Sequence, residues 1–221
     1  MSIADNTALV RERIARACER AGRDPGGVTL VGAVKQVGPA AVLDAGRAGL
    51  RDIGDNRVQE ARARSAALGS AAASFRWHLI GHLQTNKARE AATLFGMIHS
   101  IDSLRLAEAL DRRTAGKLQI LLEVNVAGEV SKSGFAPGQV SDAVSSVGRL
   151  DRLDLIGLMT VAPDVQDAEL VRPVFRQLRL LAEANGLRDL SMGMSDDFEV
   201  AVEEGATMVR IGRAIFGERP L

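Results

Sequence analysis

The feature that most constrains this chain is a regular alternation of short apolar segments with longer helical ones. Eight segments are predicted to be strands: residues 28–34, 50–54, 76–80, 97–101, 118–126, 153–159, 189–192 and 208–211. Stretches rich in Ala, Leu, Arg and Glu lie between them and are predicted to be helices, most clearly at 57–68, 104–115 and 168–185. Another helix is expected at 8–21, where apolar residues recur at helical spacing before Gly22.

Strands that alternate with helices form a parallel sheet covered by helices, so the fold class is α/β. Eight such units predict a single (β/α)8 TIM-type barrel with an extra N-terminal helix, and we expect residues 1–221 to form one barrel domain. The 221 residues suit a barrel of about 200–250 residues. A doubly wound open sheet is the alternative. The G-x-G-x-x-G fingerprint is absent after the first strand, which weakens the dinucleotide-binding form of that alternative.

Charge and cysteine content exclude several classes of function. Lys and Arg total 28, as do Asp and Glu, so a net charge of zero gives no overall attraction for nucleic acid or anionic lipid. No apolar run approaches the roughly 18 residues of a membrane span, and the charged first twenty residues contain no signal core. The single Cys18 and the absence of paired-histidine motifs argue against a metal site. We expect a cytoplasmic monomer without nucleic acid or membrane partners.

Polar residues follow most of the predicted strands. In a parallel barrel the functional site is built at the carboxyl ends of the strands and in the loops after them. Those positions carry Lys35, Asp55, Asn56, His82, Asp102, Asn125, Thr160, Ser195, Arg210 and Arg213. One polar residue at a strand end has no meaning by itself, but their collective placement predicts a ligand site at one end of the barrel.

Lys35 is the most informative of these residues. It follows the apolar run LVGAV at 30–34, and parallel strands are buried on both faces. A lysine amine shielded from water loses its proton more readily and can condense with an aldehyde to form a Schiff base. The other interpretation is a lysine that extends from the strand end into solvent. Lys35 alone does not decide between them.

Glycine-rich turns follow the last two predicted strands. Ser195 precedes Asp196 and Asp197 in a capping pattern that opens a helix to Glu204, and Gly212 precedes another short helix. Backbone N–H groups at helix N-termini bind phosphate, and barrels often place a phosphate site after strands seven and eight. Capping without a ligand fits the same residues. The two aspartates oppose a phosphate unless their side chains turn away.

Several segments together carry a family resemblance. They are AVK at 33–35, IGDNRVQE at 53–60, WHLIGHLQTNK at 77–87, HSID at 99–102, SKSG at 131–134, GLM at 157–159, LSMGMSDD at 190–197 and MVRIG at 208–212. In this order they resemble the pyridoxal phosphate (PLP) homeostasis family, whose barrel is related to the N-terminal domain of alanine racemase. The resemblance spans nearly the whole chain, and SMGMSDD is its most specific part.

The resemblance implies PLP as the cofactor and seven residues that bind it: Lys35, Asn56, Met192, Ser195, Arg210, Gly212 and Arg213. Lys35 would hold the aldehyde as an internal aldimine, and Arg210 would face the pyridine nitrogen. Ser195 and the backbone at Gly212 and Arg213 would bind the phosphate, while the remaining two would line the ring. The family usually carries Thr where Arg213 stands, so a guanidinium either replaces that hydroxyl or points outward.

The resemblance also implies a function without catalysis. The family is regarded as non-enzymatic, and PLP-dependent apoenzymes are candidate recipients of its PLP. The related racemase uses a lysine and a tyrosine from a second domain, whereas this sequence has no Tyr and ends where the barrel should close. Two alternatives stay open. One is a weak PLP-dependent racemase that uses Lys35 and another base such as His82, and the other is a Schiff-base aldolase that acts on a sugar phosphate without PLP.

Overall fold

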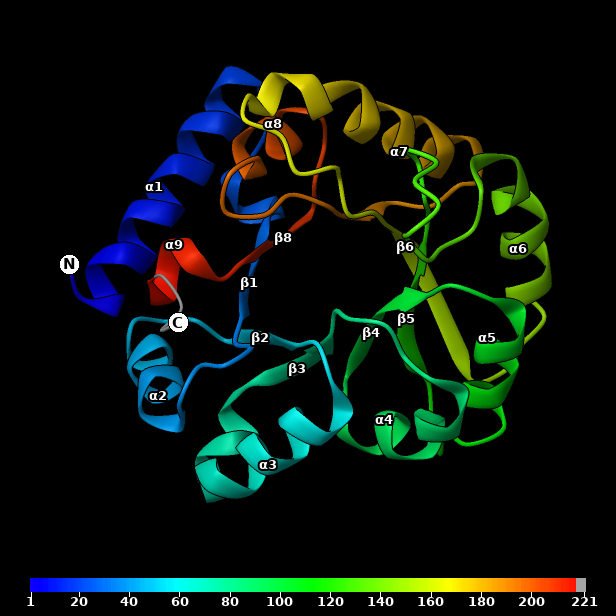
Figure 1. The fold of residues 1–221 in the computed structure, drawn as a ribbon, viewed down its shortest axis with the longest axis horizontal. Coiled ribbons are helices and arrows are strands. Elements are labelled where there is room, and N and C mark those ends of the chain that lie inside the picture. Colours follow the sequence, from blue (N-terminus) through cyan, green and yellow to red (C-terminus); the bar gives the residue numbers. More distant parts are fainter. Residues whose placement is uncertain (218–221) are drawn as a thin grey trace.

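The computed structural model describes residues 1–217, which form a closed barrel of eight parallel strands with helices around it (Figure 1). The strands are β1 (Thr29–Ala33), β2 (Asp52–Asp55), β3 (Arg76–Leu79), β4 (Met97–Ile101), β5 (Leu118–Glu123), β6 (Leu153–Met159), β7 (Asp189–Ser191) and β8 (Met208–Ile211). Parallel pairing of β1 with β8 closes the barrel and excludes the open sheet. The predicted fold class is confirmed. Residues 218–221 of the predicted domain lie outside the described residues.

The predicted strands differ from the observed ones mainly at their ends. Three have the predicted bounds, but β5 ends at Glu123 instead of residue 126. Asn125 starts the loop that follows, because its backbone N–H donates to Phe135 O at 3.0 Å. Its side-chain amide donates to Glu129 O at 2.8 Å, which folds this loop back over the strand end. A polar residue that bonds to its own loop in this way ends a strand that apolar periodicity would extend.

Each strand is followed by helical structure. The α-helices are α1 (Ile3–Arg20), α2 (Pro39–Arg47), α3 (Val58–Leu68), α4 (Ala88–Leu94), α5 (Leu104–Asp111), α6 (Val140–Val147), α7 (Arg172–Ala184), α8 (Phe198–Glu203) and α9 (Arg213–Phe216). Short 3-10 turns are η1 (Pro25–Gly27), η2 (Gly69–Ser74), η3 (Thr85–Lys87), η4 (Pro137–Gln139) and η5 (Ala168–Val171). Within residues 1–217, no helix combines the length and apolar character needed to cross a membrane.

The N-terminal helix is longer than predicted. The expected start at residue 8 is wrong, because Ser2 and Asp5 form a capping box: Ser2 Oγ accepts the Asp5 N–H at 3.1 Å, and Asp5 accepts the Ser2 N–H at 3.0 Å. The apolar side of α1 packs against α8 and α9, beside the last strands (Figure 1). The predicted helix at 168–185 is divided into η5 and α7, and the one at 104–115 ends at Asp111.

The core has two parts. The larger part lies between the strands and the surrounding helices and contains the fully buried Phe175 and Phe198. A smaller cluster is formed by residues from four different strands, so these side chains meet in the barrel interior: Met97, Leu121, Met159 and Met208. The two layers of side chains explain why the strands read as almost continuous apolar runs.

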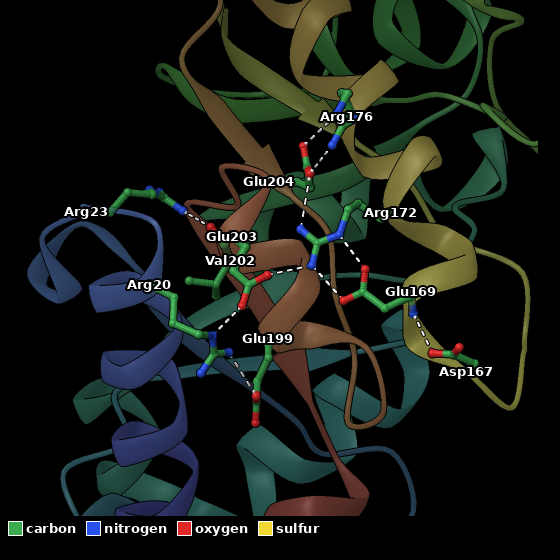
Figure 2. A network of polar contacts seen from close by, with 10 residues as sticks. All are labelled: Arg20, Arg23, Asp167, Glu169, Arg172, Arg176, Glu199, Val202, Glu203 and Glu204. Carbon is green, nitrogen blue, oxygen red and sulfur yellow. Dashed lines mark hydrogen bonds and ion pairs between the residues drawn. The ribbon is translucent and has the colours of Figure 1, made fainter.

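A charged network fastens the segments after β6 and β7 to each other (Figure 2). Arg172 at the start of α7 contacts Glu169 of η5 at 2.6 Å, Glu203 of α8 at 2.6 Å and Glu204 at 3.2 Å. Arg20 of α1 contacts Glu203 at 2.6 Å as well. Since these elements surround the loops after β6 and β7, the network fixes the scaffold on which those loops lie.

Candidate functional site

A cavity of about 490 Å³ lies at the carboxyl ends of β1 and β8 and beside the loops after β5, β6 and β7. It brings together five of the seven residues that the sequence predicted to bind a ligand: Lys35, Ser195, Arg210, Gly212 and Arg213. The loop after β6 supplies another wall, from Val161 to Gln166. The cavity therefore lies where a parallel barrel builds its site.

Lys35 lies half-buried in the turn directly after β1. The next residue, Gln36, has a φ of 61°, a left-handed conformation that costs energy for a residue with a side chain. Arg64 of α3 holds this turn, because Nη2 donates to Val34 O at 2.7 Å and Nη1 donates to Val37 O. The two carbonyl groups flank Lys35, so Arg64 determines the path of the backbone that carries the lysine.

Arg64 also forms a buried ion pair with Asp55, the last residue of β2. Its Nη2 lies 3.2 Å from Asp55 Oδ1, and the two side chains are 8% and 0% exposed. Burial raises the pKa of Asp55, and the Arg64 guanidinium acts in the opposite direction. Sequence reasoning gave Arg64 no role, because an arginine inside a predicted helix is typical of a solvated surface. The pair connects β2, α3 and the Lys35 turn.

Arg210 of β8 reaches the cavity from the barrel interior. Its Nη1 donates to Ser191 Oγ at 2.6 Å and its Nη2 donates to Thr160 O at 2.9 Å. Burial lowers the pKa of Arg210 to about 10, although the negative charges of Asp197 and Glu123 act against this shift. The guanidinium therefore stays charged at neutral pH, and it can only donate hydrogen bonds.

Ser195 connects the two glycine-rich turns. It does not cap α8, whose N-cap residue is Asp197. Instead, Ser195 Oγ accepts the Ala214 N–H of α9 at 3.3 Å, and Gly212 is the N-cap residue of α9. Because Ser195 Oγ accepts this bond, its own proton is still available for donation. Ser195 lines the cavity, where its hydroxyl can donate to an anion.

The two aspartates beside Ser195 both have partners of their own. Asp196 forms an ion pair with Arg213, whose side chain is 49% exposed. Asp197 Oδ1 accepts the Met194 N–H at 2.5 Å, and burial raises the pKa of Asp197. The guanidinium of Arg213 lines the cavity, but Asp196 compensates much of its charge. A phosphate here would thus meet a compensated pair and not an isolated cation.

Two of the predicted binding residues lie elsewhere. Asn56 lines a second cavity of about 690 Å³ next to α3, which His82 and Lys87 also line. Met192 is fully buried in the core. His82 is 57% exposed, and its Nδ1 lies 2.8 Å from Asp102 Oδ2. The structure therefore does not bring His82 or Asn56 to the cavity that Lys35 lines.

A second lysine, Lys132, lines the same cavity as Lys35. Its Nζ donates to Glu129 Oε1 at 2.6 Å, to Ala162 O at 3.1 Å and to Val161 O at 3.3 Å. An ammonium group has three donors, so Lys132 would have to break these bonds to react as an amine. No cluster of three or more metal-ligating side chains occurs among residues 1–217.

Comparison with known proteins identifies this barrel. Residues 6–220 match the family model of the alanine racemase N-terminal domain. The pyridoxal phosphate homeostasis proteins of Pseudomonas aeruginosa and Aquifex aeolicus are 46% and 42% identical to the chain, over 99% of it and over 96% and 99% of their own lengths. The structure of PipY from Synechococcus elongatus with PLP bound is 35% identical, with a TM-score of 0.84 over 98% of this chain and 100% of that one. The chain belongs to the pyridoxal phosphate homeostasis protein family.

Proposed function

We propose that the protein binds PLP in the cavity around Lys35 and acts in PLP homeostasis. The observation that carries this proposal is the convergence of an amine, a guanidinium and a hydroxyl, from Lys35, Arg210 and Ser195, on one cavity. PLP has an aldehyde, a ring nitrogen and a phosphate, and each of these groups suits one of the three side chains. The names of the curated relatives and the PLP bound to PipY support the same cofactor.

Each residue has a distinct task in this proposal. Lys35 would hold the aldehyde end of PLP through its amine, in a condensation that releases water. Ser195 would donate to a phosphate oxygen, with the backbone at Gly212 and Arg213 beside it. Arg210 would donate to the ring nitrogen and so favour its unprotonated form. When bound, PLP supplies an electron sink, and that sink is strongest with a protonated ring nitrogen.

Replacing Ser195 by Ala is expected to weaken PLP binding about ten- to a hundredfold. The change removes one hydrogen bond to a charged group, worth about 1.5–3 kcal/mol. Absorbance titration measures the affinity, and Ser195→Thr serves as the control that keeps the hydroxyl. Pyridoxal lacks the phosphate, so its binding should hardly change. An equal loss for PLP and pyridoxal would show that Ser195 acts only through its bond to Ala214.

We further propose that the protein catalyses little or no amino-acid chemistry. Racemisation of the racemase type needs a second base, and the 221 residues contain no Tyr. His82, the alternative base, lines the other cavity and is paired with Asp102. Arg210 weakens the electron sink in addition. The proposed role is therefore that of a carrier, with PLP-dependent apoenzymes in the cytoplasm as its recipients.

Incubation with L-alanine in deuterated water is expected to give α-proton exchange close to the rate of free PLP. Stoichiometric protein is used, exchange is followed by NMR, and D-alanine is measured by chiral chromatography. The matched control is Lys35→Ala, which lacks the proposed attachment site. Several turnovers per minute in the unmodified protein, lost in Lys35→Ala, would show that another residue supplies the second base.

We also propose that the protein is a monomer. Among residues 1–217, the exposed large apolar side chains come from the residue before α1, from α1, α5, η5 and α7, and from the loops after β5 and β7: Met1, Leu9, Leu104, Val130, Leu170, Leu180 and Met194. Single exposed apolar residues are normal for a protein surface. Light scattering after size-exclusion chromatography measures the mass directly, and the sequence mass is 23.5 kDa.

A further inference from the structure

A chain of hydrogen bonds crosses the barrel interior from β2 to β8. Asp52 Oδ1 lies 3.0 Å from His78 Nε2, and His78 Nδ1 lies 2.8 Å from His99 Nε2. His99 Nδ1 lies 2.7 Å from Ser191 Oγ, which accepts from Arg210 Nη1 at 2.6 Å. The five residues come from five strands. Their chain links Asp52, the first residue of β2, which does not line the cavity, to Arg210, which does.

The Asp52 carboxylate determines which ring nitrogen of each histidine carries the proton. Although burial alone would raise it, hydrogen bonds from His78 and Arg76 hold the pKa of Asp52 below its usual value, so the carboxylate accepts. His78 Nε2 must then carry a proton. A neutral imidazole has one N–H, so His78 Nδ1 accepts and His99 Nε2 donates to it. By the same rule, His99 Nδ1 accepts the proton of Ser191.

The Arg210 end demands the same order independently. A guanidinium only donates, so Ser191 Oγ accepts from Arg210 and its own proton must go elsewhere. The partner within reach for that proton is His99 Nδ1. The reverse order would leave the Ser191 O–H buried without an acceptor, which costs about 1–3 kcal/mol. Arg210 can only donate and the Asp52 carboxylate can only accept, so every hydrogen bond between them has the same donor-to-acceptor direction.

Both imidazoles are neutral in this arrangement. Burial lowers the pKa of His99 well below its usual value, with His78 and Arg210 acting in the same direction. Burial also lowers the pKa of His78, although the carboxylate of Asp52 opposes the shift. The side chains of His78, His99 and Ser191 are fully buried, so water cannot replace a missing partner between them. Among the five residues, Arg210 carries a positive charge and Asp52 a negative one, and Arg76 contacts Asp52 from outside the hydrogen-bond chain.

We propose that Asp52 is a positioning residue for Arg210, and that it acts on the cavity through His78, His99 and Ser191. The negative charge of Asp52 polarises the chain, and Ser191 presents a fixed acceptor to one amine group of the guanidinium. Thr160 O holds the other amine group at 2.9 Å. The two contacts thereby restrain the Arg210 guanidinium, and in this orientation it would face the ring nitrogen of PLP. Only this last step, toward PLP, rests on the function proposed above.

The proton order is tested by 15N NMR of the histidine rings before PLP is added. The protein has three histidines, and His82→Gln removes the exposed one from the spectrum. Both buried rings are expected to be neutral and protonated on Nε2. A proton on Nδ1 of either ring, or a doubly protonated ring at neutral pH, would overturn the proposal. This result does not depend on whether PLP binds.

The effect of Asp52 on Arg210 through the hydrogen-bond chain is tested with Asp52→Asn. We expect it to move the 15N shifts of His99, which it does not touch, and to weaken PLP binding about three- to tenfold, in the range seen for coupling across packed networks. Arg76→Gln is the matched control, because it removes the other partner of Asp52 and leaves the chain intact. It should change neither quantity.

A double-variant cycle separates a connected chain from a general loss of structure. Ser191→Ala removes the hydroxyl that connects His99 to Arg210. Adding Asp52→Asn to that variant should therefore weaken PLP binding no further. Full additivity of the two effects, or unchanged His99 shifts in folded Asp52→Asn, would overturn the proposal. If Lys35 is not the attachment site but the NMR and cycle results hold, the chain is confirmed and only the proposed PLP geometry fails.

Discussion

Lys35→Ala is expected to abolish the yellow, borohydride-reducible adduct with PLP. The lysine lies at the end of β1, lines the cavity with Arg210 and Ser195, and supplies the amine that would condense with the aldehyde. Without it the cavity keeps its contacts to the phosphate and the ring but forms no covalent bond. Absorbance titration followed by borohydride reduction measures the loss.

The matched control for this variant is Lys132→Ala. Lys132 lines the same cavity, but its three donors contact Glu129, Val161 and Ala162. The control should retain the adduct at its full amount. If the adduct is undiminished in Lys35→Ala and lost in Lys132→Ala, the covalent bond is at Lys132. That result would contradict the proposed site.

Arg64→Ala is expected to reduce the free energy of unfolding by about 3–5 kcal/mol, the usual cost of breaking a buried ion pair by removing one partner. The change leaves the Asp55 carboxylate buried without its cation, and it removes the donors to the carbonyl groups of Val34 and Val37. Denaturant unfolding measures the difference. PLP binding should weaken as well, because the turn that carries Lys35 loses its restraint.

Two further variants serve as controls for Arg64→Ala. Arg62→Ala lies on the same helix and removes a cation that is 73% exposed, so it should cost no more than about 1 kcal/mol. Arg64→Met combined with Asp55→Leu removes both charges and should recover the part of the loss that comes from the unpaired carboxylate, since apolar residues can replace a buried pair. It should not recover the part that comes from the carbonyl groups of Val34 and Val37. If Arg64→Ala costs no more than Arg62→Ala, the ion pair does not hold the Lys35 turn.

The barrel was predictable from sequence because the strand–helix alternation repeats eight times and the strands are apolar on both faces. The ends of the elements were less predictable, because they depend on single polar contacts. The bond from Asn125 to Phe135 O that ends β5 joins residues that apolar periodicity does not relate. The early start of α1 has a signal in the sequence, the Ser2 and Asp5 capping box, which lies outside the apolar spacing that predicts a helix from residue 8.

Residues of the candidate site could be predicted where a position at the end of a strand is enough to bring them to the cavity. Lys35 and Arg210 follow from the ends of strands, but Arg64 could not be found this way. It reaches Val37 across 27 residues of sequence, and nothing in a helical pattern says which arginine turns inward. The resemblance likewise named Met192 without its side-chain direction, and the structure places that side chain in the core. Whether Arg213 serves the phosphate depends on its pair with Asp196, which no local pattern predicts.

The most direct test of PLP attachment at Lys35 is to map the covalent bond in the unmodified protein. The protein is loaded with PLP, reduced with borohydride and digested, and the labelled peptide is identified by mass spectrometry. The proposed site predicts the label on Lys35, with little on the other lysines. A label found mainly on Lys132 or Lys87 would contradict it.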